Sequence, residues 1–171
     1  TVEKSTGRIA AQQRLLGKVQ VRRCYLEMQL GNYEPARVAG ETGLAIAQRY
    51  HDKQEIALAW YNLGYVAYRL GKLQEARGLL SQSLDIYREI NDRFGLVRAL
   101  NALGSVAYTM GDMALAKRLR EESLPICRET GFYSGLAAVL NNLGSLAVDA
   151  EDYDRAQEFY DESLQIRKKM N

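Results

Sequence analysis

The chain has 171 residues, of which 47% are hydrophobic and 26% are charged, a balance typical of a soluble globular protein with a sizeable core. Its 23 basic and 21 acidic residues are spread along the sequence and leave a net charge of +2, which argues against a nucleic-acid or anionic-membrane partner. No run of about 18 apolar residues and no signal-peptide pattern occurs. Because Cys24 and Cys127 also lack a CxxC spacing, we expect a cytoplasmic protein with two buried free thiols.

Markers of an internal repeat recur every forty residues. The three series are Gly31, Gly71, Gly111 and Glu151; Ala36, Ala76, Ala116 and Ala156; and Leu44, Leu84, Leu124 and Leu164. A fixed period of about 20 to 50 residues is typical of a solenoid. We therefore expect a single domain over residues 1–171, with repeats at approximately 12–51, 52–91, 92–131 and 132–171. Because the sequence begins with Thr1 rather than Met, we also expect a fragment of a longer protein with flanking domains.

Each repeat is predicted to be a helical hairpin. In the first, two segments of about seventeen residues, with apolar positions three and four apart, flank a turn at Gly31. Pro35 falls in the first turn of the second helix, where a missing N–H costs little. Asp52 and Asp92 suit the starts of the third and fifth helices, and Gly131 suits the end of the sixth.

The sixth helix contains Pro125 in its middle, where the proline ring clashes with the carbonyl of Glu121, so we expect a kink there. In total the patterns predict about eight antiparallel helices and no strand. The expected fold class is all-α.

A leucine-glycine pair recurs in the first helix of the last three repeats, as Leu63-Gly64, Leu103-Gly104 and Leu143-Gly144. Glycine in a helix interior costs about 1 kcal/mol relative to alanine, so we expect these glycines to allow a close approach of the two helices of each hairpin. The expected partners in the second helices are the small residues Ala76, Ala116 and Ala156. The first repeat has Cys24 in place of the glycine and Arg23 in place of the leucine, which marks it as degenerate.

These residues carry a family resemblance. Trp60, Leu63, Gly64, Ala76 and Leu80 resemble the tetratricopeptide repeat pattern, as do Leu143, Gly144, Ala156 and Tyr160. Alanine stands where the family usually has tyrosine, at Ala67, Ala107 and Ala147. The forty-residue step is similar to the variant in kinesin light chains and in sensor arms of bacterial signalling ATPases and transcription regulators. The resemblance implies a right-handed α-solenoid whose concave wall is lined by the first helix of every hairpin.

A binding surface is predicted on the first helices, opposite the positions that close the hairpins. Its candidate contact residues are Arg22, Tyr25, Tyr61, Asn62, Tyr65, Tyr68, Arg69, Arg98, Asn101, Ser105, Tyr108, Asn141 and Asn142. Tyrosine supplies contact area and a hydroxyl, and asparagine amides can hydrogen-bond the backbone of an extended peptide. Lys18 and the arginines outweigh Asp149, which favours an acidic or carboxylate-bearing ligand. For each single tyrosine, packing against a neighbouring repeat is an equally good interpretation.

Motifs for catalysis, metal binding or a cofactor are missing. His51 is predicted to lie in a connection, without a nucleophile placed beside it. The acidic run from Asp149 to Asp154 lacks the spacing of a calcium loop, and neither a phosphate-binding loop nor a zinc-protease motif occurs. We therefore expect a protein that is not an enzyme and needs no cofactor or metal.

The leading hypothesis is a scaffold that binds a peptide or protein segment in the concave groove. Two alternatives stay open. The chain could be an effector-sensing arm of a larger signalling ATPase or transcription regulator, or it could be a self-association module that forms a homo-oligomer through its last helix.

Overall fold

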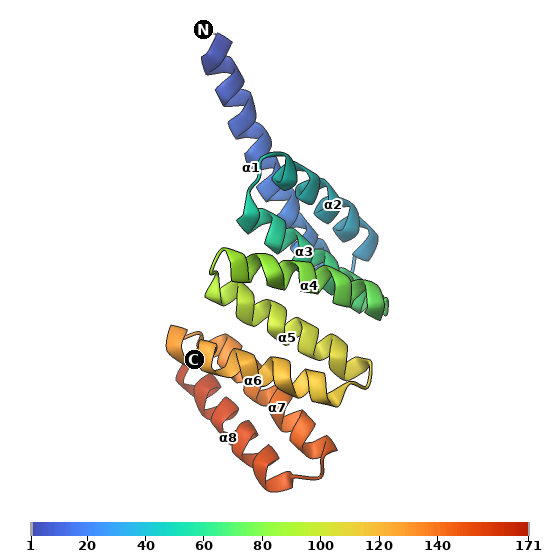
Figure 1. The fold of residues 1–171 in the computed structure, drawn as a ribbon, viewed down its shortest axis with the longest axis vertical. Coiled ribbons are helices and arrows are strands. Elements are labelled where there is room, and N and C mark those ends of the chain that lie inside the picture. Colours follow the sequence, from blue (N-terminus) through green and yellow to red (C-terminus); the bar gives the residue numbers. More distant parts are fainter. Residues whose placement is uncertain (1, 171) are drawn as a thin grey trace. The chain divides into compact units, whose positions relative to one another are not determined.

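The computed structural model describes residues 2–170, with side chains from residue 7 onward. Over this range the chain forms eight α-helices and no strand (Figure 1). They are α1 (Val2–Gln29), α2 (Tyr33–Arg49), α3 (Lys53–Arg69), α4 (Leu73–Glu89), α5 (Arg93–Thr109), α6 (Met113–Thr130), α7 (Tyr133–Asp149) and α8 (Tyr153–Met170). The predicted all-α fold of helical hairpins is confirmed. The chain divides into two compact units, Thr1–Ile90 and Asn91–Asn171, which are described in turn.

The turns have the backbone geometry that the sequence predicts. Within the hairpins, Gly31, Gly71 and Gly111 have φ values of 81°, 73° and 82°, a left-handed conformation that glycine adopts without the steric cost of a Cβ. Gly131 ends α6 in the same region, with φ of 66°. Asp52 starts α3 as an N-cap, because its side chain accepts a hydrogen bond from the Glu55 backbone N–H at 3.3 Å.

Unit 1 (α1–α4) is built around α3, which packs on both earlier helices. Val66 of α3 lies in a buried cluster with Cys24 and Met28 of α1 and Ala36 and Ala39 of α2. Farther toward the start of α3, Ala59 and Leu63 lie in a second cluster with Val21 and Leu44. Helix α1 is the longest of the described helices, and its first part extends beyond α2 (Figure 1).

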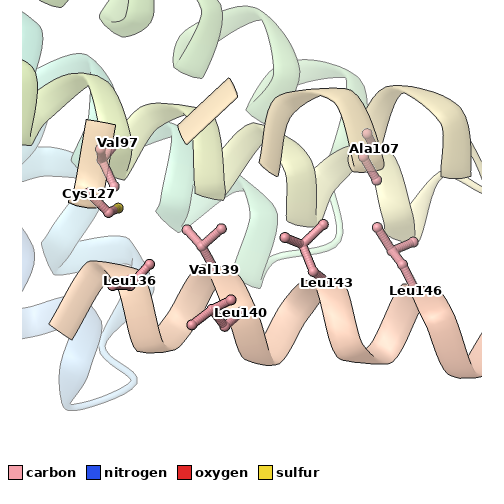
Figure 2. Packing of buried hydrophobic residues seen from close by; sticks show 9 residues of the cluster. Val97, Ala107, Cys127, Leu136, Val139, Leu140, Leu143 and Leu146 are labelled. Atoms are coloured by element: carbon pink, nitrogen blue, oxygen red, sulfur yellow. The ribbon is translucent and has the colours of Figure 1, made fainter. Parts of the chain in front are cut away.

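Unit 2 (α5–α8) has a core centred on α7. Figure 2 shows Leu136, Val139, Leu143 and Leu146 along α7, pointing toward α5 and α6. These four side chains are at most 8% exposed. Cys127 of α6 lies in the same cluster as a buried free thiol, as does Cys24 in unit 1. Burial raises the pKa of the Cys127 thiol to about 11 and that of Cys24 to about 12.

The glycines inside the first helices do allow a close approach, but not mainly to the expected alanines. A Cβ added to Gly64 would lie 2.7 Å from Leu80 Cγ and 3.1 Å from the Leu80 backbone N. The reason is the antiparallel pairing about the turn, which sets Gly64 opposite Leu80 and Ala67 opposite Ala76. Ala67 and Ala76 are 3% and 0% exposed, so the alanine at the family's usual tyrosine position is a buried residue of the hairpin.

Helix α6 runs through Pro125 without interruption, from Met113 to Thr130. Pro125 is exposed, so its ring lies on the solvent side of the helix, where the lost backbone hydrogen bond can be replaced by water.

Candidate binding surfaces

In unit 1 the predicted tyrosines form a row on one face of α3. Tyr61, Tyr65 and Tyr68 are spaced four and three residues apart, which places them on the same side of a helix. Their neighbouring ring centroids are 6.2 and 5.9 Å apart, with tilted and edge-on planes. All three are half-buried, and Tyr65 also packs against the core cluster of Cys24 and Val66. The row therefore presents ring edges at the surface while its inner side contributes to packing.

Three further predicted contact residues of α1 and α3, Arg22, Tyr25 and Arg69, are exposed. Tyr25 of α1 is 41% exposed. Arg22 forms an ion pair with Glu55, a carboxylate that is only 5% exposed. The Arg22 charge is therefore partly neutralised within unit 1. Arg69 lies at the end of α3, with its guanidinium carbon 5.6 Å from the Tyr33 ring centroid.

Asn62 was predicted to contact a ligand, and the structure corrects this prediction. It is 1% exposed, and its side-chain Nδ2 donates a hydrogen bond to the Val21 carbonyl oxygen at 2.9 Å. The residue therefore ties α3 to α1 instead of facing a ligand. The sequence-based wheel placed it at the edge of the groove, but α1 covers that edge.

In unit 2 the corresponding face of α5 and α7 is polar. The Asn142 side-chain Nδ2 donates to Asn101 Oδ1 at 2.9 Å, and both residues are half-buried. This bond links α5 to α7 much as Asn62 links α3 to α1. Asn141, one residue before, is exposed on the same helix.

A buried arginine that the sequence analysis did not single out supports this polar face. Arg120 of α6 is 3% exposed. Its Nη1 donates to the Asn142 carbonyl oxygen at 3.1 Å, and its guanidinium carbon lies 5.5 Å from the Tyr108 ring centroid. The forty-residue repeat could have indicated this burial. Arg120 stands forty residues after Leu80, at the same position of the repeat, and Leu80 is 0% exposed.

The end of this face holds several hydroxyl groups. A hydrogen bond between the Tyr108 hydroxyl and the Asp149 carboxylate, together with the carboxylate charge, raises the pKa of Tyr108. Ser145 Oγ lies 3.2 Å from the Tyr160 hydroxyl. Ser105 is half-buried and donates to the Asn101 carbonyl oxygen at 3.2 Å, so its hydroxyl oxygen can still accept hydrogen bonds. Arg98, the last of the predicted residues, is exposed on α5.

A hollow of unit 1 lies away from the tyrosine row. It has a volume of about 250 Å³ and opens between α2 and α4, over Trp60 and Leu63 of α3. Arg37, Glu41, Lys72 and other residues complete its walls. Trp60 packs against the cluster of Val21 and Leu63, so it helps to hold α3 against its neighbours.

The family follows from the sequence over both units. The profile of the tetratricopeptide repeat matches residues 15–89 and 95–169, which is most of the chain. The chain belongs to the tetratricopeptide repeat family. The sequence-based resemblance is thereby confirmed, and each matched range lies within one of the two compact units.

Solved structures with the same fold are of low sequence identity. BtubC (BKLC) from P. vanneervenii is 23% identical with a TM-score of 0.80, over 93% of this chain and 66% of that one. The apo form of RapI is 15% identical with a TM-score of 0.81, over 90% of this chain and 56% of that one. The chain thus spans two thirds or less of these proteins. No curated protein sequence matches it.

The family assignment supports a role as a repeat scaffold for protein interaction, since solenoids of this kind present extended surfaces to their partners. Members of the family are typically non-catalytic. Among the described side chains, no three His, Cys, Asp or Glu residues gather as a metal site. None of the described helices is long and apolar enough to cross a membrane.

Proposed function

We propose that the exposed faces of the first helices bind a peptide or protein segment of a partner. The observation that carries this proposal is the tyrosine row of α3, to which α1 adds the exposed Tyr25. A helix face that is only solvated is usually rich in Lys and Glu. Here the half-buried rings of Tyr61 and Tyr68 offer apolar area and a hydroxyl, the combination that is enriched at protein interfaces.

The polar face of unit 2 suits the backbone of an extended segment. Asn141 carries an amide with donors and an acceptor, and it is exposed on α7. Asn101 and Asn142 are held in place by their mutual bond and by Arg120. Such preorganised polar groups bind with less loss of side-chain entropy.

Charge favours a partner segment with acidic residues or a carboxylate. Arg69 and Arg98 are exposed on the proposed faces, and guanidinium groups bind carboxylates with two parallel hydrogen bonds. Arg22 and Lys18 add positive charge on α1, although they also form ion pairs with Glu55 and Asp52.

The test is selection from a displayed library of random peptides, followed by fluorescence anisotropy with the enriched sequences. We expect acidic residues to be enriched. The double variant Tyr25→Ala and Tyr61→Ala removes aromatic contacts without touching the buried clusters, and we expect it to weaken binding at least about tenfold. Tyr133→Ala is the matched control, because Tyr133 is 60% exposed but lies at the start of α7, off the proposed face.

Helical circular dichroism and the thermal melt of each variant should match those of the unchanged chain. If the enriched peptides bind the double variant and the control equally well, the faces of the first helices are not the binding surface.

A further inference from the structure

The hollow of unit 1 between α2 and α4 has an apolar floor. Its volume is about 250 Å³, and the side chains beneath it include Leu44, Trp60, Leu63 and Leu79. Trp60 and Leu79 are half-buried, so part of each side chain is open to the hollow. None of the residues predicted to contact a peptide lines it. It is therefore a site separate from the proposed binding faces.

Unit 2 has a hollow at the same place in the repeat, but a smaller one. It opens between α6 and α8, over α7, and every residue that lines it stands eighty residues after one that lines the unit 1 hollow. Its volume is only about 90 Å³. Phe159 and Leu146 stand there in place of the smaller Leu79 and Val66. The repeat itself therefore does not require an open hollow, and unit 1 keeps a space that unit 2 largely fills.

The size of the unit 1 hollow limits what can bind in it. An apolar cavity of about 150 Å³ accepts benzene, and sites for drug-sized molecules begin at about 300 Å³. A hollow of about 250 Å³ thus suits a single ring with a short substituent. Trp60 offers a ring of its own to such a molecule, and a contact between two aromatic rings gains more than its buried area alone.

The rim of the hollow adds charges of both signs. Arg37 and Glu41 of α2 line one wall, and Lys72 and Glu75 line the other at the start of α4. The Arg37 guanidinium donates hydrogen bonds to both Glu34 and Glu41. Lys72 is held less tightly, because its Nζ lies 3.7 Å from Glu75 Oε2, beyond hydrogen-bond distance. Lys72 can therefore bond a ligand carboxylate, and the rim carboxylates can accept from a ligand ammonium group.

We propose that this hollow binds a free amino acid with an aromatic side chain. The ring lies on the apolar floor, beside Trp60, and the ammonium and carboxylate groups lie at the rim. A rim with two cations and two carboxylates complements a zwitterion better than a ligand of one charge. This inference does not depend on peptide binding by the first helices.

Trp60 makes binding directly measurable, because it is the single tryptophan of the sequence and lines the hollow. The experiment titrates the full chain with L-phenylalanine and follows the Trp60 fluorescence, with titration calorimetry as a second measurement. We expect a saturable change in emission, with a dissociation constant in the millimolar range, as is usual for so small a ligand.

Two further compounds separate the ring from the charges. Glycine carries both charges without a ring, so it should leave the Trp60 emission unchanged. N-acetylphenylalaninamide carries the ring without either charge, so it should bind at least about threefold more weakly than phenylalanine.

Two variants copy unit 2 residues into the unit 1 hollow. Leu79→Phe places a ring where unit 2 has Phe159, and it should raise the dissociation constant of phenylalanine at least about tenfold. Lys72→Asp copies Asp152, which caps α8 by accepting from the Arg155 backbone N–H at 3.2 Å, so this variant should keep its fold. It should bind phenylalanine at least about threefold more weakly and the blocked derivative unchanged.

Gly78→Ala is the matched control in α4. Gly78 does not line the hollow, and a Cβ added there would meet no atom within 4 Å, so this variant should bind phenylalanine like the unchanged chain. Circular dichroism of each variant shows whether its fold is kept.

Three results would overturn the proposal. The first is no change in fluorescence or heat with phenylalanine up to about 10 mM. The second is equal binding of phenylalanine and its blocked derivative, which would indicate instead an aromatic side chain of a partner protein. The third is undiminished phenylalanine binding by folded Leu79→Phe or by Lys72→Asp, which would place the ligand elsewhere.

Discussion

Two glycines of the α3–α4 hairpin provide a direct test of the close helix approach. Gly64 lies in α3, where an added Cβ would be 2.7 Å from Leu80 Cγ and 3.1 Å from the Leu80 backbone N. Gly78 lies in α4, where an added Cβ would meet no atom within 4 Å. Both are helix-interior glycines, so their replacement by alanine differs mainly in the packing around the new methyl group.

The two replacements are expected to differ in their effect on stability. Gly78→Ala should raise the free energy of unfolding by about 1 kcal/mol, the difference in helix propensity between glycine and alanine. Gly64→Ala gains the same propensity term, but the methyl group must push Leu80 and the α4 backbone away, which costs about 1–3 kcal/mol in well-packed cores. We therefore expect Gly64→Ala to be less stable than Gly78→Ala by about 1–3 kcal/mol.

Trp60 makes the measurement specific to unit 1. It is the single tryptophan of the sequence, and it packs in the unit 1 core beside Leu63, so its fluorescence in a urea titration follows the unfolding of that unit. Gly104→Ala serves as a comparison in unit 2, where the new Cβ would be 3.3 Å from the flexible Arg120 side chain; its unfolding is followed by far-ultraviolet circular dichroism, because the single tryptophan lies in unit 1. Equal stabilisation by Gly64→Ala and Gly78→Ala would refute the argument that helix proximity requires glycine at position 64.

Three further changes have defined outcomes. Ser83→Ala should lower the free energy of unfolding by about 1 kcal/mol in urea, because the buried Ser83 hydroxyl donates to the Ala57 carbonyl oxygen at 2.8 Å; Ser81→Ala, at a more exposed hydroxyl, should change it by less than about 0.5 kcal/mol. Asp112→Ala should lower the thermal midpoint through the loss of about 1 kcal/mol of N-cap stabilisation, and Asp112→Asn should retain most of it. The Cys24 thiol, with its pKa raised to about 12 by burial, should leave stability unchanged below about pH 8.5, the pKa of an unfolded thiol. Above that pH the unfolded chain loses its proton first, so stability should fall toward pH 12, and this fall should be smaller in Cys24→Ala.

The repeat architecture could be predicted from the sequence because turns and helix starts depend on local chemistry. Gly31 and Gly131 adopt the left-handed conformation that their positions require, and Asp52 caps α3 as its residue type suggests. These features need only a few neighbouring residues. They could therefore be predicted from the repeated sequence alone.

The candidate site was harder to predict, because it depends on how one repeat packs on the next. Asn62 differs from the adjacent Tyr61 by one step around the helix, yet α1 buries the first and leaves the second half-exposed. Arg120 occupies a core position that is Leu80 in the preceding repeat. No rule of local sequence predicts that a guanidinium would be placed there and bonded to Asn142 of the following helix.

The separate cores of the two units affect how the chain unfolds. Val66 and its neighbours close one core within residues 1–90, and Leu140 and its neighbours close another within residues 91–171. In repeat proteins, such quasi-independent blocks unfold in steps whose free energies can differ. Amide hydrogen exchange in α3 and in α7 should then report two opening equilibria, and the less stable block would set the lifetime of the chain in the presence of a protease.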